Sequence, residues 1–146
     1  MNISVSVRSE KDILQTFLET NGKQQTLALP VKESGFGSAI NGGELLCLAL
    51  ATCFCNDIYR EAATLGIAVQ SCEVHVQSEF GAAGDPGKHL RYAVKIQSGE
   101  STDRIIQLIE HTDSVAEIHK TIRLGTPISL EISDLNDTAG NPAKNS

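Results

Sequence analysis

Apolar and polar residues alternate at the start of the chain, and this pattern predicts an antiparallel meander. Residues 3–7, ISVSV, place every second side chain on one apolar face, a period typical of a half-buried strand. Two further strands are predicted over 12–20 and 25–31. Asn21-Gly22 lies between them, and this dipeptide strongly favours a tight hairpin turn.

The periodicity becomes helical after residue 41 and stays helical to about residue 65. Asn41 is a favourable N-cap, Glu44 stands three positions later as in a capping box, and Gly66 suits the position just after a helix. The first half of this segment, LLCLALATCFC, is apolar nearly all round. A helix of this kind is buried on every side. One small domain has little chain with which to cover it, so we expect a partner subunit.

The second half of the chain is predicted to hold a hairpin, two helices and a last strand. Ser114 and Glu117 have the spacing of a second capping box, and Gly125 suits the end of that helix. The predicted elements are strands at 72–76 and 90–96, helices at 101–111 and 114–124, and a strand at 128–132.

These elements predict a single α+β domain over residues 1–133. Their order is βββ-α-ββ-α-α-β, with a long central helix that covers antiparallel sheets. The chain has 146 residues, which is enough for one domain with its own core. Residues 134–146 have no core-forming pattern, and we expect them to be a flexible C-terminal tail.

Composition narrows the classes of function. The formal net charge is −6 and aromatic residues make up 4% of the chain, so we expect no nucleic-acid partner, which would need a basic face or stacking platforms. The sequence contains no window of 18 apolar residues and no signal-peptide layout. We therefore expect a cytoplasmic protein without a membrane partner. Four cysteines in such a protein are expected to be reduced.

Three of the four cysteines lie in the predicted central helix, at different angles around it. Two residues turn about 200° on a helix, so Cys53 and Cys55 point about 160° apart and cannot form a disulfide while the helix is intact. Cys47 is also out of reach of Cys55. Arg60 shares the stripe of Cys53 and is its nearest cation. From spacing alone, packing as small apolar side chains explains the four cysteines, Cys72 included, better than catalysis.

Glu44 and one segment rich in histidine and acid are the other candidates for chemistry. Glu44 is a weak candidate for a general base, because its capping position explains it and it faces away from Cys53 on a regular helix. The segment HTDSVAEIHK contains His111, Asp113, Glu117 and His119. These residue types bind metals, but their spacing matches no compact ligand pattern. We therefore predict no metal site and, in the absence of a nucleotide or phosphate motif, no cofactor.

Two segments of the chain resemble a known family. NGGELLCLALATC, residues 41–53, resembles the central-helix signature of the OsmC/Ohr proteins (osmotically inducible protein C and organic hydroperoxide resistance), which runs roughly NPEELLLAALAAC. AEIHKTIRLGTPI, residues 116–128, resembles the family segment CPVSKTLRxGVPI. The matching positions of the first segment are Asn41, Glu44, Leu45, Leu46, Ala49, Leu50, Ala51 and Cys53. The chain is identified as a divergent OsmC-like member.

The resemblance implies an intertwined homodimer with active sites at the subunit interface, and reduction of organic hydroperoxides. In the family, a thiolate activated by a Glu and an Arg becomes a sulfenic acid, which a second Cys resolves. Cys53 falls on the position of that thiolate. The resolving position falls on Ala116 and the activating Glu on Gly43. No Arg stands between Arg8 and Arg60 to match the family's activating Arg.

The sequence leaves two functions open. The first is a thiol peroxidase in which Cys53 is the sole peroxidatic cysteine, Arg60 and Glu44 are weaker catalytic candidates, and an external thiol is the reductant. The second is a catalytically lapsed dimer that binds a small apolar molecule in its interface pocket. The retained Cys53 favours the first, and the loss of the family's other functional residues favours the second.

Overall fold

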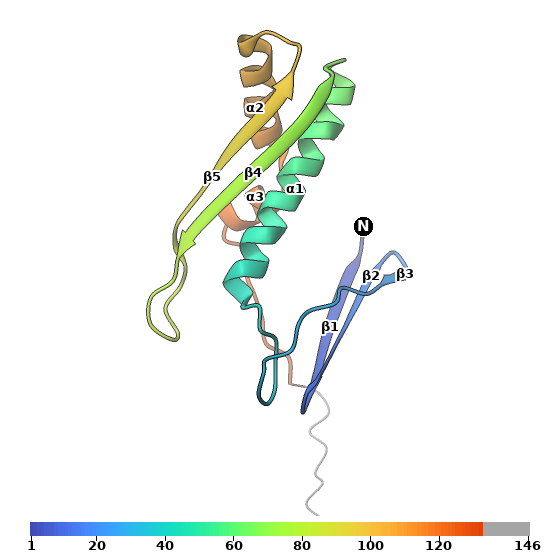
Figure 1. The fold of residues 1–146 in the computed structure, drawn as a ribbon, viewed down its shortest axis with the longest axis vertical. Helices are drawn as coiled ribbons and strands as arrows, with labels where there is room; N and C mark the ends of the chain where they lie inside the picture. Colours follow the sequence, from blue (N-terminus) through green and yellow to red (C-terminus); the bar gives the residue numbers. More distant parts are fainter. Residues whose placement is uncertain (133–146) are drawn as a thin grey trace, which may run out of the picture.

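The computed structural model describes residues 1–132 and contains two antiparallel sheets and three helices within this range (Figure 1). The elements are β1 Ile3–Glu10, β2 Ile13–Thr20, β3 Lys23–Gln25, α1 Gly42–Thr64, β4 Val69–Glu79, β5 Lys88–Ser98, α2 Thr102–Val115 and α3 Glu117–Arg123. One sheet has the order β1-β2-β3 and the other pairs β4 with β5. The predicted α+β class with a long central helix is confirmed.

The N-terminal sheet, β1–β3, is set by a tight turn and ends earlier than predicted. Asn21 and Gly22, with φ angles of 50° and 81°, join β2 to β3 and confirm the predicted hairpin. The third strand, Lys23–Gln25, is shorter than the sequence indicates. Beyond it, the hydroxyl of Thr16 accepts from the Leu27 amide at 3.1 Å and donates to the Leu27 carbonyl. Because a side chain satisfies these backbone groups, the strand ladder ends there.

The apolar face of the N-terminal sheet is covered on β2 but open on β1. Thr16 is buried, whereas Val7, its direct neighbour across the strands, is 59% exposed. Ile3 and Val5, on the same face of β1, are exposed to a similar degree. The prediction of a half-buried first strand is therefore wrong for the single chain, because the cover of this face stops at β2.

The central helix α1 begins and ends where the sequence predicts. The side chain of Asn41 accepts from the Glu44 amide at 2.9 Å, and the Glu44 carboxylate accepts from the Asn41 amide at 2.8 Å. This reciprocal pair confirms the capping box. Gly66 follows the helix with a φ angle of 64°. Leu46 and Leu48 remain exposed, so a single chain does not bury the first half of α1 on every side.

The core lies where α1 packs against β4, α2 and α3. Phe54 and Ile58 of α1 and Leu108 of α2 are fully buried. Val74 and Val94 oppose each other across the β4–β5 pair and pack against this cluster. Figure 1 shows the β4–β5 hairpin lying beside α1, with β4 next to the helix. The N-terminal sheet stands apart from this hairpin. The C-terminal unit, comprising α1, β4, β5, α2 and α3, therefore contains the core.

The two C-terminal helices break at a different residue from the predicted one. Ser101 caps α2 by accepting from the Arg104 amide. The predicted capping residue Ser114 lies inside α2, where its hydroxyl donates to the His111 carbonyl at 2.7 Å. Ala116 instead stands before α3 without a side-chain cap. The predicted second capping box is therefore wrong, because a bond within the last turn of α2 already engages the serine.

The predicted last strand is also absent from the described residues. Ile128 is 100% exposed, and Leu130 and Ile132 are exposed as well, with no strand pairing over 128–132. The alternation marks an apolar face, but a strand also needs a neighbouring edge for its backbone. The predicted tail, 134–146, lies outside the described residues. Within the described residues, no helix combines the length and apolar character needed to cross a membrane.

Candidate active site

Cys53 lies half-buried on the side of α1 that meets the start of α3. Its thiol donates to Oδ2 of Asp57, one turn along the helix, at 3.5 Å. The backbone amide of Ile118 in α3 also approaches the sulfur. The carboxylate of Glu117 completes the group, since the sulfur and one oxygen each of Asp57 and Glu117 lie within 4.8 Å of one another. The immediate surroundings of the thiol are therefore acidic.

Arg60 is joined to Cys53 through Asp57 rather than directly. Its Nη1 lies 2.7 Å from Oδ1 of Asp57 and 3.6 Å from Glu117, and its Nε lies 2.8 Å from Glu61. These three carboxylates surround the guanidinium. Cys53, Asp57 and Glu117 offer atoms of the type that bind metals, but the guanidinium already provides the positive charge that Asp57 and Glu117 require.

The environment of Cys53 favours the thiol over the thiolate. Burial raises the pKa of Cys53 above its ordinary value, the amide of Ile118 lowers it, and the charges of Asp57 and Glu117 raise it further. The amide is thus outweighed. An activated cysteine has the opposite arrangement, in which a cation or a set of amides dominates. A single chain holds Cys53 as a protonated thiol at neutral pH.

Glu44 is not part of this group, because both its amide and its carboxylate serve the capping box at the start of α1. The neighbouring Gly43 is the position on which the family's activating Glu falls. A Cβ atom at Gly43 would stand 2.8 Å from Cε2 of Phe80. The phenyl ring thus occupies the space that a side chain at this position would enter.

The histidines and acids of 111–119 are separated in the structure. His111 contacts Glu61 with its Nε2 at 3.0 Å, and Glu117 faces Arg60 and Cys53. Asp113 accepts from Arg123 at 2.7 Å and from the hydroxyl of Tyr92. His119 is buried in the core. Because α2 turns into α3 at Ala116, the four side chains face different partners.

Cys55 and Cys72 lie next to each other where α1 meets β4. Burial, together with the smaller effect of the adjacent Cys55 thiol, raises the pKa of Cys72 to about 12. Cys55 points to β4, where its thiol contacts the Cys72 carbonyl at 3.9 Å. Cys53 and Cys55 thus face different elements, as their phase on the helix predicts. The contact between Cys55 and Cys72 was not predictable from spacing, because it depends on how β4 lies across α1.

A small apolar pocket lies beside this site. It has a volume of about 210 Å³ and includes Leu50 of α1, one turn before Cys53 and Phe54. Its remaining lining side chains are Val76, Leu90, Tyr92, His119, Ile122 and Arg123. Neither Tyr92 as a site residue nor this pocket was predicted from the sequence, and His119 was predicted only as a possible metal ligand. The pocket joins side chains from α1, β4, β5 and α3, and the spacing of residues along the chain carries no signal for this.

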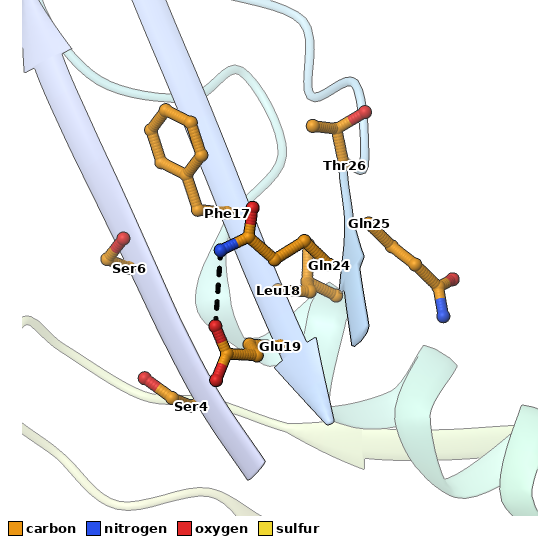
Figure 2. A pocket seen from close by; sticks show the side chains of 8 residues that line it. All are labelled: Ser4, Ser6, Phe17, Leu18, Glu19, Gln24, Gln25 and Thr26. Carbon is orange, nitrogen blue, oxygen red and sulfur yellow. Dashed lines mark hydrogen bonds between the residues drawn. The ribbon is translucent and has the colours of Figure 1, made fainter. Parts of the chain in front are cut away.

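A larger hollow of about 570 Å³ lies on the opposite, more polar face of the N-terminal sheet (Figure 2). Ser4, Ser6, Phe17 and Glu19 line it, and Gln24 reaches across to donate to Glu19 at 3.2 Å. Its lining contains no cysteine, histidine or cation. The hollow is larger than the apolar pocket beside Cys53. Its lining nevertheless lacks the residue types needed for the chemistry expected at Cys53.

Comparison with known proteins places the fold. An OsmC-like protein from Mycoplasma pneumoniae has 17% identity, covers 84% of this chain and 86% of its own, and has a TM-score of 0.59. A putative osmotic stress induced and detoxification response protein from Psychrobacter arcticus 273-4 has 19% identity, coverage of 80% and 85%, and a TM-score of 0.59.

A third structure adds a bound molecule, and the sequence itself matches a family. A putative organic hydroperoxide resistance protein from Vibrio cholerae, with captopril in one of its active sites, has 21% identity, coverage of 84% and 85%, and a TM-score of 0.55. No curated protein matches. Residues 35–131 match the family described as OsmC-like protein, and the chain belongs to this family.

Proposed function

We propose that the protein reduces organic hydroperoxides with Cys53 as its sole peroxidatic cysteine and an external thiol as the reductant. The observation that carries the proposal is the position of Cys53. Its half-buried thiol lies at the junction of α1 and α3, beside an ion network and one helical turn from an apolar pocket. Membership of the OsmC-like family and the presence of hydroperoxide resistance proteins among the structural neighbours support this assignment.

The proposed reaction needs one cysteine of the chain and two external thiols. The Cys53 thiolate attacks the terminal oxygen of the peroxide, the O–O bond breaks, and the alkoxide takes a proton to leave as an alcohol. Cys53 becomes a sulfenic acid. An external thiol attacks the Cys53 sulfur and releases water, and a second external thiol restores Cys53 and leaves as a disulfide. An external thiol is needed because the family's resolving position falls on Ala116, which has no thiol. Ala116 is also fully buried.

The reaction is expected to be slow at neutral pH in this chain. Only the thiolate attacks, and the charges around Cys53 raise its pKa. Arg60 contributes indirectly, since it neutralises Asp57 and Glu117 and so limits their effect on the sulfur. Removing Arg60 should therefore slow the reaction further, whereas removing Glu44 should affect only the start of α1.

Stopped-flow reaction of the reduced protein with an organic hydroperoxide tests the proposal. We expect oxidation of Cys53 at a rate above that of a free thiol of similar pKa, and no such phase in Cys53→Ser. Mass spectrometry of the trapped sulfenic acid identifies the residue that reacts. A rate no greater than that of the free thiol would remove the peroxidase function.

A second candidate function is a catalytically lapsed homodimer that binds a small apolar molecule at its interface. The acidic surroundings of Cys53, which raise its pKa, favour this function. The proposed dimer is supported by the open apolar face of β1 and by the exposed Leu46 and Leu48 of α1. Retention of one hydrophobic ligand by a dimer that does not react with peroxide would favour this function over the first.

A further inference from the structure

The pocket between α1, the β4–β5 hairpin and α3 contains a buried histidine that has no partner. His119 is 5% exposed, and neither of its ring nitrogens has a hydrogen-bond partner among residues 1–132. Its ring packs edge-on against Phe54 and Tyr92, with centroids 5.2 and 4.7 Å away. A buried polar group without a partner destabilises the fold, and most such groups in native proteins are satisfied. An unpaired imidazole in a pocket wall is thus a feature that a ligand would explain.

The other polar side chains of the pocket are already engaged with one another. Asp113 accepts both the hydroxyl of Tyr92 and the guanidinium of Arg123. Tyr92 has its pKa raised to about 12, first by burial and then by Asp113, so it stays neutral. Arg123 has its charge matched by Asp113. Arg123 donates to Asp113 through Nη2 and is half-exposed, so the buried hydrogen-bonding capacity left over in the pocket belongs to His119.

The charge of His119 sets the kind of head group that fits. Burial and the nearby Arg123 lower the pKa of His119, against smaller opposing effects of Asp113 and Asp57. A neutral imidazole has one donor and one acceptor. The imidazole therefore matches a ligand group that both donates and accepts a hydrogen bond, such as a hydroxyl. A neutral imidazole has no positive charge with which to attract a carboxylate. The rest of the wall is aliphatic, from Leu50, Val76, Leu90 and Ile122.

We propose that this pocket binds a small, neutral, apolar molecule that carries one hydroxyl-type group, and that His119 is the hydrogen-bond partner of that group. The volume of about 210 Å³ is below the roughly 300–1,000 Å³ of sites for drug-sized ligands, so the body of the ligand is compact. The site lies within one chain and does not require Cys53 to react, so it goes beyond the function proposed above.

The pocket is nevertheless placed to serve Cys53. Ile118, whose amide approaches the Cys53 sulfur, immediately precedes His119, and Leu50 precedes Cys53 by about one helical turn. An alcohol is the product of hydroperoxide reduction and a hydroperoxide carries the same type of head group. The alcohol or the hydroperoxide would bind in the pocket through its hydroxyl-type group. An alcohol does not react with Cys53, so its binding can be measured separately from the reaction.

Benzyl alcohol and toluene form a matched pair of probes, since they differ only in the hydroxyl group. We expect the full-length reduced protein to bind benzyl alcohol about threefold to tenfold more tightly than toluene, as one net hydrogen bond provides. Chemical shifts of the pocket residues, followed by NMR titration, give both affinities. The chemical shifts of the His119 ring nitrogens should change when benzyl alcohol is added and should not change when toluene is added.

His119→Phe and Cys53→Ser are the matched variants. His119→Phe keeps a ring in the wall, should raise the melting temperature because an unpaired polar group is removed, and should bind both probes equally. Cys53→Ser should keep the preference for the alcohol even if the peroxidase function fails. The proposal is overturned if the two probes bind equally to the natural protein, if neither moves the pocket signals, or if benzoate binds more tightly than benzyl alcohol.

Discussion

The N-terminal sheet and the C-terminal unit both contain strands with alternating apolar residues, but only the second buries them. Val5 in β1 is 59% exposed, whereas Val74 in β4 packs against the core cluster. The difference arises because α1 lies across β4, while the cover on the N-terminal sheet stops at β2, where Thr16 is buried. Alternation therefore specifies which face of a strand is apolar, but not what covers it.

The same contrast applies to chemistry. Asp57 joins Cys53 and Arg60 within α1, and the packing of α3 on α1 brings Glu117 to the same group. In the N-terminal sheet, Arg8 pairs with Glu10 of its own strand at 2.6 Å, with both side chains exposed. An exposed pair of this kind contributes little to stability. Three experiments test whether the two regions differ as described.

The largest expected effect is on stability. Phe54→Ala removes a fully buried ring at the centre of the core and should lower the free energy of unfolding by about 3–5 kcal/mol. Phe17→Ala, which removes an exposed ring from β2, should lower it by only about 0.5 kcal/mol. Urea denaturation followed by circular dichroism measures both. Equal losses would show that the N-terminal sheet belongs to the cooperative core, which would contradict its separation from the C-terminal unit.

The next effect concerns the open face of β1. If a second copy of the chain covers it, Val5→Asp should raise the dimer dissociation constant at least about tenfold, because burial of one valine contributes about 1.5–3 kcal/mol. Ser6→Asp adds the same charge to the opposite face of β1 and should leave dimerisation unchanged. Sedimentation velocity over a range of concentrations gives the constants. A natural protein that stays monomeric, or variants with identical constants, would contradict the proposed cover.

The smallest effect is on the reactivity of Cys53. Asp57→Asn removes a negative charge next to the sulfur, which should lower the thiol pKa and so speed alkylation by iodoacetamide at pH 7 severalfold. Because burial and the nearby carboxylates raise the pKa of Cys53, the natural protein should react about tenfold faster for each pH unit between 7 and 9.

Glu10→Gln provides the control in the N-terminal sheet, where loss of a similar charge should leave the alkylation rate unchanged. Peptide mass spectrometry separates Cys53 from the other cysteines. A slower reaction in Asp57→Asn would mean that Asp57 accepts the thiol proton and assists the attack. A change in Glu10→Gln would mean that a partner's N-terminal sheet reaches the site.

Local signals in the sequence predicted most of the elements, but not the surroundings of the candidate residue Cys53. The turn at Asn21-Gly22 and the capping box at Asn41 were predicted correctly because each depends on neighbours within four positions. The predicted cap at Ser114 was wrong because the Ser114 hydroxyl donates to the His111 carbonyl, three positions earlier in α2. The strand at 128–132 failed because its partner would have to come from elsewhere in the molecule.

The sequence by itself determined the α1 helix, the separation of Cys53 from Cys55 and the OsmC-like family. These follow from short-range geometry and from residues adjacent along the chain. Only the tertiary structure decided that Glu117 joins Asp57 beside Cys53, and that His119 stands in an apolar pocket without a hydrogen-bond partner among the described residues. The physical reason is that pKa values and unsatisfied hydrogen bonds depend on which elements pack together, and the packing of α3 on α1 joins residues more than sixty positions apart.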